Sequence, residues 1–357
     1  MKTPVSRSAP KPASKSAPKS ILRSASKSAS KSAPKSAPKL APKLPPGPVW
    51  GNFAQDELDR QYNSRATVPD FTVFTRQYAE LTTAAKAAAK ATADSNRACV
   101  ENLRYGPGDD ETFDFYPAAT GDNAQGAAQR AARGATQEAA PVMVFLHGGD
   151  WRTLSKDDSG FAAPAFTAAG VHFIALNFSL VPTLTVPQMG GQVRDALAWI
   201  AKNIGTHGGD PKRIFIAGHS SGANLVAQLL ITDWAEEFSL PPDLIKGATF
   251  ISGLGDLEPV RLSFRNGQLK LNKAMVEAAS LLNHAPRASC PLLVAFGANE
   301  MREYHRQGQA VAAHWRRHGL PVQTIKLAER NHFDAVLEWA DPASALFQAN
   351  LAMIQSN

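Results

Sequence analysis

The sequence of 357 residues has little cysteine and no long apolar run. Cys99 and Cys290 are too few for a disulfide scaffold. Neither has the histidine context of a nucleophilic thiol, so we interpret both as buried or tolerated thiols. No apolar stretch reaches the ~18 residues of a membrane span, and no apolar signal-peptide core of ~7–15 residues lies near the N-terminus. These absences predict a soluble, cytoplasmic protein without a membrane partner.

Acidic residues are missing from residues 1–47, which carry nine Lys and two Arg. Because the whole chain has 38 basic and 31 acidic residues, the remainder carries 27 and 31, a net charge of −4. Repeats such as KSAPKSAPKLAPK contain few bulky apolar side chains, so we predict that residues 1–47 form a disordered tail rich in Lys, Ser, Ala and Pro. Three roles stay open for this tail: a solubilising extension, a weak contact with polyanions such as nucleic acid, or organelle targeting.

Signatures of nucleotide and metal binding are also missing from the sequence. It contains no P-loop and no dinucleotide-binding glycine fingerprint after a strand. His314 and His318 have the spacing of a helical metal site, but no Glu follows the first histidine and no third ligand is evident. We interpret this pair as a solvated helix face and predict no metal.

Residues 48–357 are predicted to form one domain, in which apolar runs alternate with segments of helical spacing. The predicted strands are 111–117, 141–149, 171–178, 213–219, 247–253, 291–297 and 321–329. The segments predicted to be mainly helical are 55–104, 190–204, 222–235, 303–319 and 333–355, and the small-residue stretch 118–140 is predicted to be a flexible loop. Because most of the strands are continuous apolar runs, the pattern indicates a mostly parallel sheet with helices on both faces.

In open α/β sheets, functional groups gather beyond the carboxyl ends of the strands. The strand 213–219 is followed by GHSSG, which matches G-x-S-x-G with Ser220 at its centre. Gly218 and Gly222 suit a sharp turn in which side chains would collide. The helix that follows brings its N-terminal N–H groups near the serine, where they favour negative charge. We predict that Ser220 is a nucleophile, and that Ser221 contributes a backbone N–H instead.

A second glycine group, HGGDWR, follows the strand that begins at residue 141. Glycines let the backbone approach a substrate, and backbone N–H donors aimed at a developing oxyanion are often a large catalytic contribution. We therefore predict an oxyanion hole made by the N–H groups of Gly148, Gly149 and Ser221. His147 precedes both the glycines and the serine, and we interpret it as structural.

Glu300 and His332 each lie just after a predicted strand. With Ser220 they occur in the chain order nucleophile, acid, base. His332 would take the proton of Ser220 and later return it to the leaving group, while Glu300 would hold the imidazole in the right tautomer. Asp256 follows an earlier strand and is the main alternative acid.

At these positions the sequence resembles the α/β-hydrolases, and more narrowly the kynurenine formamidase (arylformamidase)-like esterases. The blocks that carry the resemblance are LDRQYNSRATVPDF (58–71), HGGDWR (147–152), GGDPKRIFIAGHSSGANLVAQLL (208–230), SGLGDLEPVRLSF (252–264), GANEMREYHRQ (297–307) and NHF (331–333). The resemblance implies an α/β-hydrolase fold and a cofactor-free serine hydrolase that acts on a small formamide or ester.

One position departs from the pattern of this family. An aromatic residue usually follows the HGG segment there, whereas this chain has Asp150. A carboxylate beside the oxyanion hole could alter substrate preference, so Asp150 is a candidate pocket residue. Trp151 is either an aromatic wall of the same pocket or a core residue.

Overall fold

The computed structural model describes residues 47–91, 98–119 and 139–357. The predicted tail 1–47 and the predicted loop 118–140 lie outside the described residues, apart from residues at their edges. Eight strands form one sheet in the order β1-β2-β4-β3-β5-β6-β7-β8. The strands are β1 (Val100–Arg104), β2 (Thr112–Tyr116), β3 (Ala140–Leu146), β4 (His172–Leu176), β5 (Gly209–His219), β6 (Ile245–Ile251), β7 (Leu292–Gly297) and β8 (Val322–Leu327).

The sheet is mostly parallel, as the apolar runs predict. Every pair from β4 through β3 and on to β8 is parallel, and only the pairs that involve β2 are antiparallel. Strands β4 and β7 are buried along their whole length, whereas β8 at the edge is largely exposed. Continuous apolar strands require cover on both faces, and this requirement selects the parallel arrangement.

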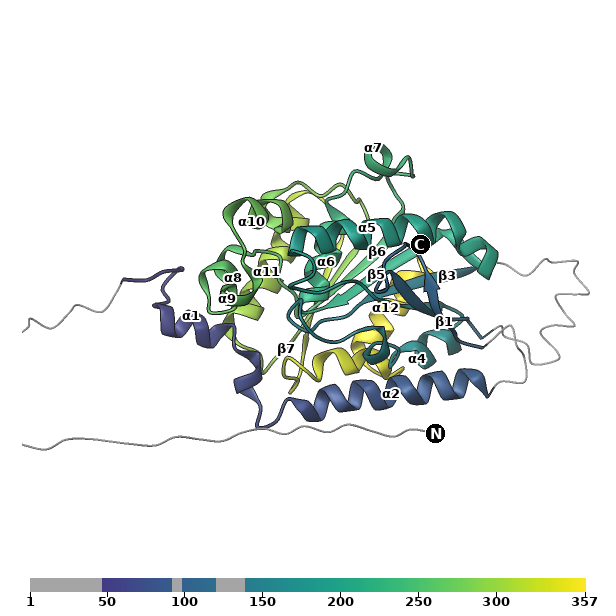
Figure 1. The fold of residues 1–357 in the computed structure, drawn as a ribbon, viewed down its shortest axis with the longest axis horizontal. Coiled ribbons are helices and arrows are strands. Elements are labelled where there is room, and N and C mark those ends of the chain that lie inside the picture. Colours follow the sequence, from purple (N-terminus) through teal and green to yellow (C-terminus); the bar gives the residue numbers. More distant parts are fainter. Residues whose placement is uncertain (1–46, 92–97, 120–138) are drawn as a thin grey trace, which may run out of the picture. The chain divides into compact units, whose positions relative to one another are not determined.

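Helices supply that cover on both faces of the sheet (Figure 1). Side chains of β3 alternate, so that Val142 and Val144 join one core cluster while Met143 and Phe145 join another. The helices that contribute to the first cluster include α5 (Val186–Asn203), α6 (Ser221–Leu230) and α11 (Arg302–Arg317). Those that contribute to the second are α2 (Thr72–Lys90), α4 (Ala163–Ala168), η6 (Ala335–Ala340) and α12 (Ala345–Gln355).

Short helices fill the connections between these elements. They are α1 (Gln55–Gln61), η1 (Ser64–Thr67), η3 (Lys156–Asp158), η4 (Ile204–His207), α7 (Trp234–Phe238), α8 (Glu258–Leu262), α9 (Asn266–Leu269), α10 (Lys273–Ala279) and η5 (Leu281–Asn283). Within the described ranges, every helix is either too short or too polar to span a lipid bilayer.

Two predicted helical segments end earlier than their sequence pattern indicates. Val100–Arg104 is strand β1 rather than helix, because pairing with β2 supplies its backbone hydrogen bonds at the edge of the sheet. The helix predicted over 222–235 stops at Leu230. Asp233 then caps a new helix, α7, by accepting the N–H of Glu236 at 3.1 Å.

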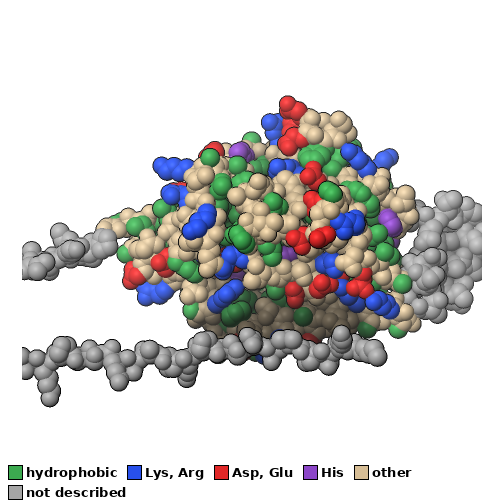
Figure 2. Space-filling view, in the orientation of Figure 1, with side chains coloured by type: hydrophobic (Ala, Val, Ile, Leu, Met, Phe, Trp, Pro, Cys, Tyr) green, Lys and Arg blue, Asp and Glu red, His purple; other side chains and the backbone are tan. Residues whose placement is uncertain are grey.

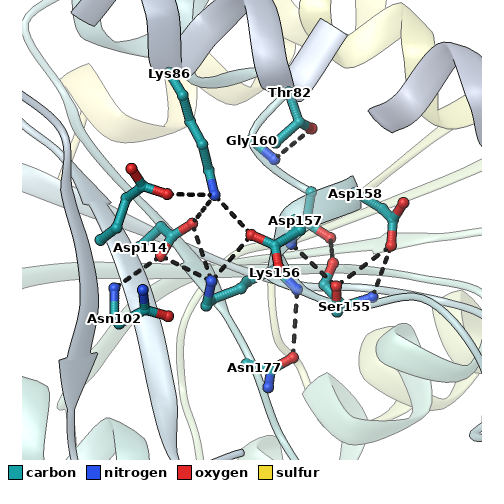
Figure 3. Close-up of polar contacts among 12 residues, drawn as sticks. Thr82, Lys86, Asn102, Asp114, Ser155, Lys156, Asp157, Asp158, Gly160 and Asn177 are labelled. Atoms are coloured by element: carbon teal, nitrogen blue, oxygen red, sulfur yellow. Dashed lines mark hydrogen bonds and ion pairs between the residues drawn. The ribbon is translucent and has the colours of Figure 1, made fainter. Parts of the chain in front are cut away.

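A buried charge cluster joins α2, β2 and η3 (Figure 3). Lys86 Nζ lies 2.6 Å from Asp114 Oδ2, 2.6 Å from Asp157 Oδ1 and 2.9 Å from Glu101 Oε2. Burial alone would lower the pKa of this ammonium, but its hydrogen bonds to the three carboxylates outweigh that effect and raise the pKa. The three carboxylates come within 4.8 Å of one another, and Lys86 supplies the positive charge that they need.

Asp114→Asn is expected to destabilise the fold strongly. Asp114 is fully buried and also pairs with Lys156 at 3.2 Å, so the variant removes the one fully buried counter-charge of two largely buried ammonium groups. We expect the free energy of unfolding in urea to fall by about 3–5 kcal/mol. Asp157→Asn is the matched control, because Asp157 contacts the same two lysines but is 64% exposed. There we expect a loss below about 1 kcal/mol, and equal losses in both variants would contradict the prediction.

Candidate active site

Ser220 stands in the turn between β5 and α6. Its backbone has φ of +54° and ψ of −118°, a strained conformation for a residue with a side chain. A Cβ at Gly222 would lie 2.1 Å from the carbonyl oxygen of Leu146, and one at Gly218 would lie 2.5 Å from the backbone of Gly222. Both flanking glycines are therefore required by close backbone packing, as the sequence pattern predicts.

Ser220 and Glu300 contact the two ring nitrogens of His332. The Ser220 Oγ lies 3.0 Å from Nε2, and the Glu300 Oε2 lies 3.0 Å from Nδ1. An ionised carboxylate only accepts hydrogen bonds, so Nδ1–H donates to Glu300 and the lone pair of Nε2 faces the hydroxyl. All three residues are at least nine-tenths buried. The structure thus brings together the three side chains that the sequence order singles out.

Two donors fix the carboxylate of Glu300. Its Oε1 accepts the backbone N–H of Gly297 at 2.6 Å and the hydroxyl of Ser252. The alternative acid, Asp256, instead pairs with Arg306 at 3.4 Å and accepts the backbone N–H of the residue two positions on. Among the described residues, the only carboxylate that contacts His332 is that of Glu300.

The HGG segment leaves β3 and passes beside Ser220. A Cβ at Gly148 would lie 3.3 Å from the Ser220 Cβ, so the backbone approaches the serine closely here. Gly149 has φ of +102°, and a Cβ there would lie 2.0 Å from the carbonyl oxygen of Thr153. Within the described part of the chain, the N–H groups of Gly148, Gly149 and Ser221 donate no hydrogen bond to the protein. Three free donors beside a serine hydroxyl can stabilise an oxyanion.

Asp150 and Trp151 follow the glycines with φ of +60° and +56° and point to different places. Asp150 lines the cavity and forms ion pairs with Arg152 at 3.0 Å and with Arg265 at 3.3 Å. Trp151 is 1% exposed and belongs to the core, so it does not line the cavity. The backbone N–H of Trp151 donates to Ser221 Oγ at 3.1 Å and thereby ties the glycine loop to the start of α6.

A cavity opens at the side chain of Ser220. Segments far apart in the sequence meet around it: the N-terminal region, the glycine loop and the turns after β5, β6 and β8. Its lining residues are Tyr62, Asn63, Ser64, Arg65, Phe71, Thr75, Tyr78, Gly149, Asp150, Arg152, Thr153, Leu154, His219, Ser220, Phe264, Arg265, His332 and Phe333. The wall is thus partly aromatic and partly basic, and the nucleophile candidate faces it.

A family model for the alpha/beta hydrolase fold matches residues 143–334, which is more than half of the chain. The chain belongs to the α/β-hydrolase family. This α/β-hydrolase is 28% identical over 318 residues to a protein named kynurenine formamidase from Danio rerio, with 85% of this chain and 98% of the relative covered. Kynurenine formamidase from Salmo salar is 29% identical over 259 residues, covering 71% and 81%. These matches confirm the predicted resemblance, and the protein is a hydrolase.

Solved structures agree with this α/β-hydrolase fold. A putative thioesterase from Silicibacter sp. TM1040 superposes with a TM-score of 0.66 at 24% identity, covering 84% of this chain and 99% of the other. Esterase B from Lactobacillus rhamnosis, inhibited by a tributyrin phosphonate, gives a TM-score of 0.59 at 15% identity, covering 82% and 94%. At sequence identities below 25%, these superpositions show a similar fold only.

Several residues of this hydrolase's site carry weak sequence signals. Tyr304 lies beside His332 with ring centroids 4.4 Å apart, and His219 lies on another side at 5.0 Å. The Nε2–H of His219 donates to the carbonyl of His332 at 2.8 Å. His219 directly precedes the nucleophile candidate, and Tyr304 lies in the first turn of α11, just after Glu300, so proximity in sequence could have indicated both. Arg265 lies between short helices without any pattern that would reveal it.

The remaining histidines have structural contacts. His147 stacks on Phe178 with ring centroids 4.3 Å apart, and burial lowers the pKa of His147 to about 4. His314 is only 5% exposed and hydrogen bonds to the carbonyl of His284 at 2.8 Å, so the prediction of a solvated helix face is wrong at this position. The reason is that α11 turns this face toward the segment before β7 rather than toward solvent.

His219 is expected to make stability pH-dependent. Burial, followed by the charge of His332, lowers the pKa of His219 from 6.5 to about 3. The unfolded chain therefore binds this proton more readily, and the contribution of His219 is complete above pH ~6.5 and lost as the pH falls toward 3. Between pH 7.5 and 5.5 we expect His219 to account for a loss of about 1.4 kcal/mol. Urea unfolding of His219→Gln should show a shallower pH dependence by that amount, and parallel profiles would contradict this account.

Proposed function

We propose that this hydrolase cleaves a small formamide or a short-chain carboxylic ester with Ser220, His332 and Glu300, and that an arylformamide of the N-formylkynurenine type is its first candidate substrate. The observation that carries the proposal is the chain of two 3.0 Å contacts from Ser220 through His332 to Glu300, opening on a cavity. The relatives named kynurenine formamidase, which match most of the chain, support the formamide.

The geometry accounts for each step of acyl transfer. His332 takes the Ser220 proton as Oγ attacks the carbonyl carbon, and Glu300 stabilises the resulting imidazolium. The N–H groups of Gly148, Gly149 and Ser221 receive the oxyanion. The imidazolium then protonates the leaving amine or alcohol. Water attacks the formyl- or acyl-serine with the same histidine as base, which releases the acid and restores the serine.

A general carboxylesterase is the second candidate, and Asp150 is the observation that favours it. The Asp150 carboxylate lines the cavity. In the family that this sequence resembles, an aromatic residue usually follows the HGG segment at this position. A charged group at that place changes which substrates the cavity accepts, because a buried charge must be paired or solvated.

Hydrolysis of N-formylkynurenine and of 4-nitrophenyl acetate by the wild-type chain separates these candidates. We expect both to be hydrolysed, with the larger kcat/KM for the formamide. Turnover of the ester alone would favour the carboxylesterase, and turnover of neither would refute the proposed chemistry. A fluorophosphonate probe should add one label, located by mass spectrometry on the peptide that contains Ser220.

We further propose that residues 48–357 are the hydrolase domain and that residues 1–47 add, at most, a weak polyanion contact. Figure 2 shows acidic and basic side chains interspersed over the described residues of one face, without a broad basic area there. Deleting residues 1–47 should therefore leave kcat/KM unchanged while removing any salt-dependent binding to DNA. DNA binding that survives the deletion would place the contact on the hydrolase domain.

A further inference from the structure

The guanidinium of Arg265 is buried in the wall of the cavity that Ser220 faces. The residue is only 7% exposed, and its Nη2 donates to the Tyr304 hydroxyl at 3.0 Å. The guanidinium carbon also lies 5.7 Å from the ring centroid of Tyr62. Tyr304 and Tyr62 thus hold the planar group on two sides, so its position is well determined.

The other terminal nitrogen of Arg265 has an unused donor. Nη1 lies 3.3 Å from Asp150 Oδ1, but the two atoms lack hydrogen-bond geometry, and neither has a hydrogen-bond partner among the described residues. The second oxygen of Asp150 is already engaged by Arg152 at 3.0 Å. Buried donors on charged groups are nearly always paired, so an unpaired one on a residue that lines a cavity indicates a ligand group.

The balance of charge around the cavity gives the sign of that ligand group. Among the lining residues, Asp150 is the only acidic one, whereas Arg65, Arg152 and Arg265 are basic. Asp150 can neutralise one guanidinium, so the wall keeps a net positive charge beside Ser220. An anionic group is favoured there, and a guanidinium fork matches the two oxygens of a carboxylate.

We propose that Arg265 is a specificity-determining residue that binds a carboxylate of the substrate through Nη1 while Ser220 attacks the formamide or ester carbonyl. The inference rests on the proposed function and narrows its substrate class to acids that carry a free carboxylate. Asp150 competes with this carboxylate for Arg265 and thereby moderates its binding.

Calorimetry on the full-length Ser220→Ala chain tests this proposal, because binding is then measured without turnover. The two ligands are N-formylkynurenine and its carboxamide, which differ only in the carboxylate. We expect the acid to bind about 10- to 100-fold more tightly than the amide, the range expected for a hydrogen bond to a charged partner. Equal affinities, or no binding of the acid, would overturn the proposal. Failure of the proposed function would appear separately, as absent turnover in the wild-type chain.

Second-site variants in the Ser220→Ala chain assign the effect to a residue. Arg265→Met should reduce the ratio of acid affinity to carboxamide affinity to about 1–3. Arg65→Met removes an exposed positive charge from the same wall, and it should change that ratio less than about twofold. Equal losses in both variants would show a general electrostatic effect of the positive wall and refute the role of Arg265.

Asp150→Asn should tighten binding of the acid, by about 3- to 10-fold, because the competing charge is gone. If Arg265→Met does not fold, Asp150→Asn decides alone, and unchanged or weaker binding of the acid would refute the proposal.

Discussion

Ser220→Ala is expected to lower kcat by about 10⁴- to 10⁶-fold for both the formamide and the ester, with little change in KM. In the proposed mechanism this hydroxyl forms the covalent intermediate, and its 3.0 Å contact with His332 is lost in the variant. Residual activity would come from the three oxyanion donors and from binding in the cavity. Steady-state kinetics and the loss of fluorophosphonate labelling measure the effect.

Ser221→Ala is the matched control for this prediction, because it removes the neighbouring hydroxyl and retains the backbone N–H of Ser221. Its side chain accepts the N–H of Trp151 at 3.1 Å, so the variant loosens the glycine loop. We expect kcat to fall by no more than about tenfold, because the loop loosens but every backbone donor remains, whereas outright loss of one donor would cost about 10²- to 10³-fold. An inactive Ser221→Ala chain beside an active Ser220→Ala chain would exchange the roles of the two serines.

Glu300→Gln is expected to lower kcat by about 10³- to 10⁴-fold. The glutamine keeps the shape of the side chain but not the negative charge that stabilises the imidazolium of His332. If its carbonyl oxygen accepts the backbone N–H of Gly297 and the hydroxyl of Ser252, its N–H₂ faces Nδ1–H of His332, which it cannot accept. The loss should lie in kcat rather than KM, which initial-rate measurements with the ester will separate.

Asp256→Asn tests the alternative acid under the same conditions. Asp256 pairs with Arg306, and its backbone N–H donates to Oε1 of Gln307 at 2.9 Å. We expect kcat to change by less than about fivefold, because no contact with the base is removed. A large loss in Asp256→Asn together with an active Glu300→Gln chain would move the acid to Asp256.

Much of the fold follows from local sequence patterns. The runs that became β3, β4, β7 and the second half of β5 are mostly apolar and buried, a pattern that fits strands covered on both faces. Strand β1 escaped prediction because its exposure alternates between partial and full, so it carries little apolar signal. Its strand character comes from the partner β2, which the local sequence of β1 does not reveal.

The candidate site, like the fold, has parts that the local sequence predicts and parts that it does not. Ser220, Gly148, Gly149 and His332 could be predicted because each follows a strand, and the carboxyl ends of parallel strands meet at one edge of the sheet. As the acid that contacts the histidine, Glu300 could be favoured over Asp256 from the sequence only because of the predicted strand that it follows. The choice between them depends on which carboxylate contacts His332, and that contact joins residues 32 positions apart.

The sequence by itself determined the α/β alternation and the sharp serine turn, because both depend on neighbours within a few positions. It also fixes the order of the three candidate catalytic residues along the chain. Tertiary structure decided what local patterns cannot contain. It buried Trp151 in the core, turned Asp150 toward the cavity and set it against Arg265, more than a hundred residues away in the chain. The net positive charge of the cavity arises because the fold gathers Arg65, Arg152 and Arg265 around Asp150, from positions that are distant from one another in the chain.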